Sequence, residues 1–142
     1  MPGALLLCLV VGVTDGDTLK ARFATEPPQT ITIRLAEIDA PERGQPFGTR
    51  SKQHLASLCF RQEAEVRPTA ADRYGRTVAR VSCAGIDANA AMVQAGMAWA
   101  FTRYLTDSGI DALEHQAQLD GVGLWADADR MPPWEWRRSQ VR

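Results

Sequence analysis

Five short segments of the chain have the alternating apolar and polar residues expected of β-strands. The clearest is TITIRLAEI, in which Ile31, Ile33 and Leu35 alternate with polar or small residues. This spacing is that of a strand with one buried face. The predicted strands are residues 9–14, 18–23, 30–38, 63–68 and 76–83. Short strands separated by turns in this way are typical of a small closed barrel.

Turns and one irregular loop separate these strands. The first two strands are joined by the sequence DGD, where we expect Gly16 to take the positive φ of a tight turn. The last two surround TAADRYG, where Gly75 permits the same conformation. DAPERGQPFG, residues 39–48, contains two prolines and two glycines, so regular structure is not expected there. Residues 37–48 therefore form the loop in which functional groups are expected.

Three helices are predicted from helical spacing and end signals. The first begins at Gly48 or Thr49 and ends at Cys59, the second occupies residues 86–96 with Asp87 as its N-cap, and the third begins at Asp107 or Ser108 and ends near Asp120. Residues 124–142 are expected to form an irregular tail rich in tryptophan. The chain is therefore predicted to be a single α+β domain over residues 1–142, an OB-type five-stranded β-barrel with three helices packed on it.

Composition and charge narrow the classes of function. The chain has 142 residues, of which 45% are hydrophobic, and this suits one domain. Its net charge of −1 argues against a uniformly basic surface that holds nucleic acid by bulk electrostatics. Residues 1–80 nevertheless hold eleven Lys and Arg against nine Asp and Glu, whereas residues 81–129 hold one against seven. A site for a polyanion is therefore expected within residues 1–80.

The chain begins with the apolar segment MPGALLLCLVVGV. This segment is too short to span a bilayer and lacks the basic start and cleavage site of a complete signal peptide. Residues 1–7 are either the remnant of an export signal or the first residues of a strand. No association with a membrane is expected.

Cys8, Cys59 and Cys83 lack the C-x-x-C spacing of a zinc site. Cys59 ends the first predicted helix, just before one strand of the second hairpin, and Cys83 ends the other strand. Both should lie at the open end of that hairpin, within reach of a disulfide, and Cys8 would remain a free thiol. The alternative is that Cys59 and Cys83 are buried free thiols.

The carboxylates of the first hairpin point to metal chemistry. Asp15 and Asp17 are two positions apart, so both can face one point in space, where their charges repel unless a cation neutralises them. Asp39 and Glu42 follow the third strand in the irregular loop and could add oxygen ligands or a base. With no histidine or cysteine nearby, a hard cation, Ca²⁺ or Mg²⁺, is favoured. A D-G-D sequence alone is more often a plain hairpin turn.

Two arginines complete the pattern. Arg34 precedes Asp39 by five residues and Arg76 follows the second hairpin turn. A planar guanidinium suits a phosphate whose charge grows during attack. The alternative is that both are strand-surface charges paired with carboxylates. Carboxylates around a cation, a spare Glu and two arginines predict metal-assisted hydrolysis of a phosphodiester.

Three motifs in this chain, VTDGDT, IRLAEIDAPE and DRYGR, resemble in their order and spacing the staphylococcal nuclease (thermonuclease) family. GMAWAFTRY and the ending PPWEWRR are similar to its exported bacterial branch. The resemblance extends from about Cys8 to Arg138. It implies an OB-type barrel, dependence on Ca²⁺, hydrolysis of both DNA and RNA, and a monomeric enzyme that is secreted or periplasmic.

The resemblance also implies a role for individual positions. The implied metal ligands are Asp17, Asp39 and the backbone carbonyl of Ala40, with Asp15 acting through a water molecule. The implied catalytic residues are Glu42 as general base and Arg34 and Arg76 as phosphate-binding groups. The implied nucleotide contacts are Tyr74 and Tyr104, while Thr102 stands where the family's type member has a second tyrosine.

A function of a different class is a catalytically silent OB-type module that binds nucleic acid or protein. Degenerate domains of the family lack the metal-ligand and general-base residues, all of which this chain retains. The C-terminal arginines are expected to form a solvated end, with assistance to the approach of nucleic acid as the alternative: Arg130, Arg137, Arg138 and Arg142.

Overall fold

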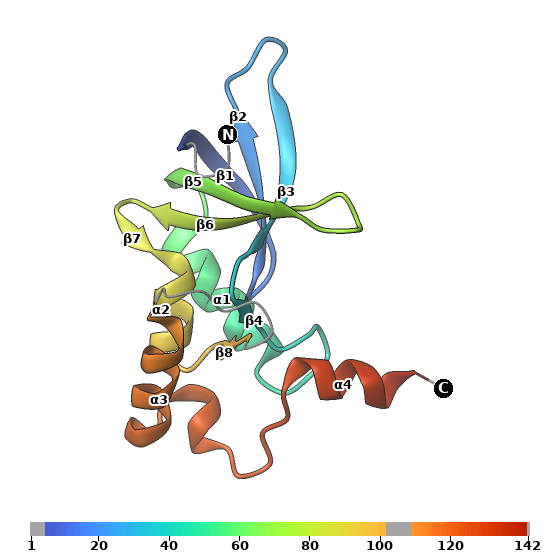
Figure 1. Ribbon diagram of the computed structural model, residues 1–142, viewed down its shortest axis with the longest axis vertical. Coiled ribbons are helices and arrows are strands. Elements are labelled where there is room, and N and C mark those ends of the chain that lie inside the picture. Colours follow the sequence, from blue (N-terminus) through green and yellow to red (C-terminus); the bar gives the residue numbers. More distant parts are fainter. Residues whose placement is uncertain (1–4, 102–108, 142) are drawn as a thin grey trace.

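A computed structural model describes residues 5–101 and 109–141 of the chain (Figure 1). Five strands form the barrel: β1 (Leu6–Asp15), β2 (Thr18–Phe23), β3 (Gln29–Leu35), β5 (Glu63–Ala71) and β6 (Thr77–Cys83). Short strands flank them: β4 (Ile38–Asp39), β7 (Ile86–Asp87) and β8 (Trp99–Ala100). The helices are α1 (Gly48–Cys59), α2 (Ala88–Gln94), α3 (Ile110–Asp120), α4 (Pro133–Gln140) and a 3₁₀ turn at Gly123–Ala126.

The barrel closes through one parallel strand pair. Its strands run β3-β2-β1-β5-β6, each antiparallel to the next, and β3 then pairs in parallel with β6. In that pair Ile33 lies opposite Thr77 and Arg34 opposite Val78. The predicted five-stranded α+β barrel is confirmed. Closure places Arg34 at the same end of the barrel as the β5–β6 turn.

The apolar residues that alternate along the strands fill the interior of the barrel. Val10, Leu19, Ile33, Val66 and Val81 come from five different strands and are at most 1% exposed. Each fully buried aliphatic side chain of this kind contributes roughly 1.5–3 kcal/mol. The packed barrel therefore supports the turns at its ends. The helices lie below the barrel in Figure 1.

The first hairpin turn depends on its glycine, although not for the predicted reason. Gly16 is not among the residues with positive φ, whereas Gly75 has φ 81° as predicted. A Cβ on Gly16 would lie 1.8 Å from Ser51 Oγ and 2.8 Å from the Ala40 Cβ. Gly16 is needed because α1 and the irregular loop press against the turn.

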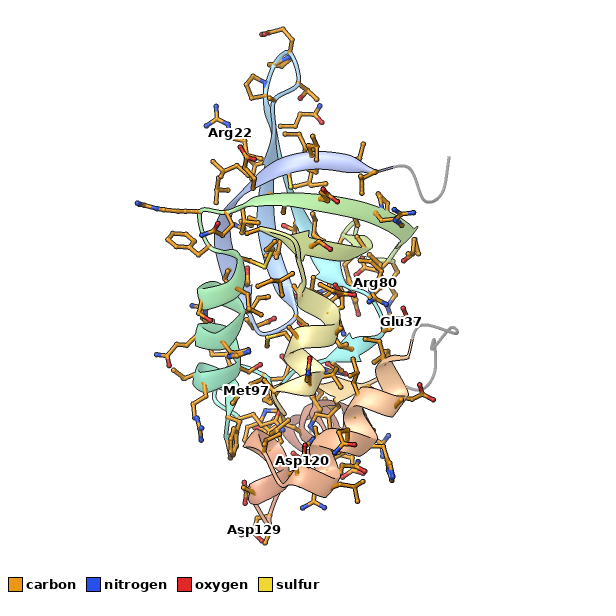
Figure 2. All side chains as sticks on the ribbon, turned by 90° about the vertical axis from the view of Figure 1, so that its left-hand side faces the viewer. Arg22, Glu37, Arg80, Met97, Asp120 and Asp129 are labelled. Carbon is orange, nitrogen blue, oxygen red and sulfur yellow. A yellow bond between two sulfur atoms is a disulfide. The ribbon has the colours of Figure 1, made fainter. Side chains whose placement is uncertain are left out.

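An ion-pair network fixes the chain between β3 and β4. Arg80 Nη1 lies 3.1 Å from Glu37 Oε2, and Arg80 also pairs with Asp87, the N-cap of α2. Figure 2 shows Glu37 and Arg80 side by side. Asn89, which is fully buried, donates to the Ala36 carbonyl at 2.9 Å. These contacts hold the segment that delivers the next residues, Ile38–Asp39, to the site.

The disulfide prediction is confirmed. Cys59 and Cys83 are bonded, with their Cα atoms 5.1 Å apart. Cys8 is free and buried.

The prediction of an irregular tail over residues 124–142 is wrong. Besides the 3₁₀ turn, this segment contains α4, so the described residues hold four α-helices rather than three. Pro133 occupies the first helical position, where its fixed φ favours a helix. Trp134 then packs against Trp99 and Phe101, with ring centroids 5.9 Å apart in both pairs. Tertiary packing thus stabilises a helix that its own sequence signals leave weak.

Within the described ranges, no helix is both long enough and apolar enough to cross a bilayer.

Candidate active site

Asp17 ties the first hairpin to the irregular loop. Its side chain is buried at the start of β2, and Asp17 Oδ2 accepts a hydrogen bond from the Ala40 N–H at 2.7 Å. Its other oxygen, Oδ1, accepts from the Thr18 hydroxyl at 2.9 Å. The Asp17 carbonyl also accepts from the Leu35 N–H at 2.7 Å. The Asp17 carboxylate therefore has a fixed place between β2, β3 and the loop.

Asp39 and Arg34 complete the buried part of the site. The Asp39 side chain is 1% exposed, and the pairing of β4 with β8 sets Asp39 opposite Trp99. Arg34 Nη2 lies 3.6 Å from Asp17 Oδ2 and 3.6 Å from Asp39 Oδ1, while Arg34 Nη1 donates to the Leu35 carbonyl at 2.7 Å. One guanidinium thus contacts both of the carboxylates that the resemblance assigns as direct metal ligands.

The carboxylates perturb one another's ionisation. Burial, and then the charge of Asp17, raises the pKa of Asp15 to about 7. Burial opposes ionisation of Asp17 too, but the Arg34 guanidinium and hydrogen bonds hold the pKa of Asp17 below its ordinary value. Burial raises the pKa of Asp39, against the opposing effect of the hydrogen bond from Arg137. The carboxylates of the cluster carry more negative charge than the neighbouring arginines neutralise. Such an excess favours a bound cation.

Glu42 lies on a compact loop beside this cluster. The Glu42 N–H donates to Gln45 Oε1 at 3.0 Å, and the Gln45 N–H donates back to the Glu42 carbonyl at 3.0 Å. A Cβ on Gly48 would lie only 2.2 Å from the Glu42 carbonyl oxygen, so this close turn requires glycine there. The Glu42 side chain is 34% exposed. Glu42 is therefore held by its backbone while its carboxylate stays open to solvent.

Arg137 is a residue of this cluster that sequence reasoning missed. Arg137 Nη2 lies 2.7 Å from Asp39 Oδ2, Nη1 lies 3.3 Å from Asp39 Oδ1, and Nη1 also bonds Glu42. The prediction that this arginine is part of a solvated end is wrong. The sequence held only a partial signal: Trp134 and Arg137 are three residues apart, and so share one face of a helix. Because Trp134 packs against Trp99 and Phe101, Arg137 faces the site.

Arg76 and Tyr74 lie at the β5–β6 turn. Arg76 Nε bonds Asp72 Oδ2 at 2.6 Å, and the Arg76 guanidinium lies 5.7 Å from the centre of the Tyr74 ring. Arg76 directly precedes Thr77, the first residue of β6. Because β6 pairs in parallel with β3, Arg76 lies near the end of β3 that carries Arg34. Tyr74 is 70% exposed. The turn therefore adjoins the Arg34 strand, but the Arg76 side chain is paired with Asp72 and not with the carboxylate cluster.

Tyr104 and Thr102 lie outside the described residues.

The donor atoms at the site suit a hard cation. They are carboxylate oxygens of Asp15, Asp17 and Asp39 and the carbonyl of Ala40, with no nitrogen or sulfur ligand among them. Over residues 5–101 and 109–141, however, no three acidic, histidine or cysteine side chains are gathered as a ready-made metal centre. The residues present fit Ca²⁺ by chemistry and burial, and Asp39 is already paired with Arg137.

Comparison with known proteins identifies the class of protein to which this fold and site belong. The family model described as staphylococcal nuclease homologue matches residues 32–127. The chain belongs to the staphylococcal nuclease family.

Individual relatives extend this likeness over nearly the whole chain. A micrococcal nuclease of Shigella flexneri is 45% identical, over 92% of this chain and 79% of that protein. An uncharacterized endonuclease of Haemophilus influenzae is 41% identical, over 94% of this chain and 74% of that protein. An uncharacterized endonuclease of Escherichia coli is 40% identical, over 92% of this chain and 84% of that protein.

Proposed function

We propose that this protein is a Ca²⁺-dependent nuclease that hydrolyses phosphodiester bonds of DNA and RNA. The observation that carries the proposal is the convergence of two buried carboxylates, Asp17 and Asp39, on one arginine, Arg34, with a solvent-accessible glutamate beside them. The family and its nuclease-named relatives support the nuclease part of this proposal.

The proposed ligands of Ca²⁺ are the Asp17 and Asp39 side chains and the Ala40 carbonyl, with Asp15 acting through a water molecule. When bound, Ca²⁺ supplies a positive charge that polarises the phosphate and offsets the charge developed during attack. Asp17 is oriented for this role because Thr18 and the Ala40 N–H fix its carboxylate. Burial of Asp39 keeps competing solvent away from the ion.

Glu42 is the proposed general base. Its carboxylate takes a proton from the attacking water, which then attacks phosphorus in line with the departing 5′-oxygen and leaves a 3′-phosphate. This role requires access to water and a fixed position. Partial exposure of the Glu42 side chain provides the first, and its backbone hydrogen bond to Gln45 provides the second.

Arg34 and Arg76 are the proposed phosphate-binding groups. Arg34 is 15% exposed and is preorganised by its bond to the Leu35 carbonyl, so little reorganisation is needed when charge grows on the phosphate. Arg76 would exchange Asp72 for the phosphate when substrate binds. The exposed Tyr74 ring beside it is available to contact a nucleotide, and Tyr104 is assigned the same role by family position alone.

A catalytically silent module that binds nucleic acid or protein is the second candidate. The contact between Arg137 and Asp39 favours it, because a carboxylate already paired with a guanidinium is less available to a metal. Retention of every acidic and basic position of the family pattern favours the enzyme.

Because a disulfide suits an oxidising compartment, we propose that the protein is secreted or periplasmic. We also propose that it is a monomer.

The experiment that separates the two functions uses end-labelled DNA and RNA oligonucleotides. The purified chain is incubated with each in Ca²⁺, and the products are separated on a gel. Shortened products whose 3′ ends accept extension only after phosphatase treatment support the enzyme. Oligonucleotides that are bound, as judged by a gel shift, and yet stay intact support the silent module.

A further inference from the structure

We propose that Arg137 competes with the cation for Asp39 and thereby sets the affinity of the site for Ca²⁺. The inference rests on the proposed function, since it concerns the same carboxylates. It adds a residue from the C-terminal helix α4 that none of the sequence motifs assigns to the site.

The contact with Asp39 engages both oxygens of that carboxylate. Nη2 of Arg137 donates to Oδ2 and Nη1 to Oδ1, in the forked geometry that a guanidinium favours. The Asp39 side chain is 1% exposed, so it has little other access to solvent. A cation that binds Asp39 would coordinate the same two carboxylate oxygens and would lie close to the positive guanidinium. Each partner therefore weakens the binding of the other.

The second arginine on this carboxylate is held in a different way. Arg34 stays 3.6 Å from Asp39 and is anchored by its bond to the Leu35 carbonyl. Its side chain is 15% exposed, whereas that of Arg137 is 45% exposed. Arg137 can therefore turn into solvent when a cation arrives, while Arg34 remains in place to face a phosphate.

Helix α4 is held beside β8 and the irregular loop by contacts other than Arg137. Trp134 stacks on Phe101 and meets Trp99 edge to face. The Met131 carbonyl accepts a hydrogen bond from Gln45 Nε2 at 2.6 Å. Loss of the Arg137 side chain should therefore leave the helix docked, which makes a substitution at this position interpretable.

The test measures the affinity for Ca²⁺ directly, by calorimetric titration of the full-length protein without nucleic acid. Arg137→Ala is compared with the unaltered protein and with Arg138→Ala. Arg138 neighbours Arg137 on α4, is exposed, and carries the same charge, so its variant controls for a general change in electrostatics. We expect Arg137→Ala to bind Ca²⁺ at least about fivefold more tightly, the lower end of ordinary coupling between two sites. Arg138→Ala should differ from the unaltered protein by much less.

The outcomes separate this inference from the proposed function. Equal affinities in the unaltered protein and Arg137→Ala, or weaker binding by the variant, would overturn the competition while leaving a Ca²⁺ site intact. The same enhancement in Arg138→Ala would also overturn it. An absence of Ca²⁺ binding in every chain would defeat both proposals. If Arg137→Ala does not fold, Arg137→Gln replaces it, because glutamine removes both the positive charge and the fork while keeping a polar side chain, and tighter binding is again expected.

Discussion

The side chain of Gln45 accepts a hydrogen bond from the backbone N–H of Glu42 at 3.0 Å. Its amide nitrogen donates to the Met131 carbonyl at 2.6 Å, and Gln45 is 5% exposed. One buried amide thus joins the loop of the proposed base to the segment that precedes α4. The position of Glu42 depends on a residue close to the other end of the chain.

Gln45→Ala should therefore affect both stability and turnover. Removal of the amide leaves the Glu42 N–H and the Met131 carbonyl without their partner, which should lower the free energy of unfolding by about 1–3 kcal/mol. Urea denaturation measures that loss. Gln45→Glu is the matched variant, because it keeps an acceptor for Glu42 but places a second acceptor against Met131. Gln45→Glu should lower turnover as much as Gln45→Ala if only the contact with Met131 matters. If Gln45→Glu instead restores turnover, the contact with the Glu42 N–H is the important one.

Glu42→Gln tests the general base. Glutamine has nearly the same shape and retains one oxygen for Arg137, so folding and Ca²⁺ affinity should change little. Turnover should fall by about 10²- to 10⁴-fold, because the amide cannot accept the proton of the attacking water. Steady-state kinetics with a labelled oligonucleotide measure this. A rate equal to that of the unaltered protein would remove Glu42 from the mechanism.

Asp17→Ala and Asp39→Ala test the ligand assignment. Each removes a negative charge that the cation requires, so residual cleavage should need far more Ca²⁺. The measurement is the Ca²⁺ concentration that gives half-maximal cleavage. Asp129→Ala is a control for loss of one acidic side chain, since Asp129 is exposed and lies outside the carboxylate cluster. An unshifted Ca²⁺ requirement in both ligand variants would show that the ion binds elsewhere.

Thiol chemistry checks the disulfide. Denatured, unreduced protein should show one reactive cysteine per chain, and the native protein should react slowly because burial raises the pKa of Cys8 to about 11 and keeps its thiol protonated. Replacing Cys59 and Cys83 together by alanine should lower the free energy of unfolding by about 3 kcal/mol, since the bond closes a loop with a sequence separation of 24. Three reactive thiols in the denatured protein would exclude the bridge.

Local signals in the sequence were sufficient to predict the barrel and the disulfide between Cys59 and Cys83. Strand alternation depends only on which face each residue buries, and a hairpin places its two open ends together whatever the details of packing. The grouping of Asp17, Asp39 and Arg34 at one site came instead from the resemblance to the family, since strand alternation alone pairs only Asp15 with Asp17.

The features that sequence reasoning missed depend on tertiary packing. Arg137 and Asp39 are 98 residues apart, and nothing local to PPWEWRR specifies which surface α4 covers. Gly16 was predicted to be needed for a positive φ, but the contact that requires it comes from Ser51 on another element. Such contacts become visible only when the positions of α1 and α4 in the folded chain are known.

This protein is proposed to cleave nucleic acid with Ca²⁺ bound at the Asp17–Asp39 site. The most direct measurement is cleavage of a supercoiled plasmid by chelator-treated protein to which Ca²⁺ or Mg²⁺ is added back in increasing amounts. We predict no nicking in chelator, full cleavage restored by Ca²⁺, and little restored by Mg²⁺, because oxygen ligands on turns and loops suit the larger and less directional ion. Cleavage that continues in excess chelator, or a plasmid that stays intact at every Ca²⁺ concentration, would contradict the account.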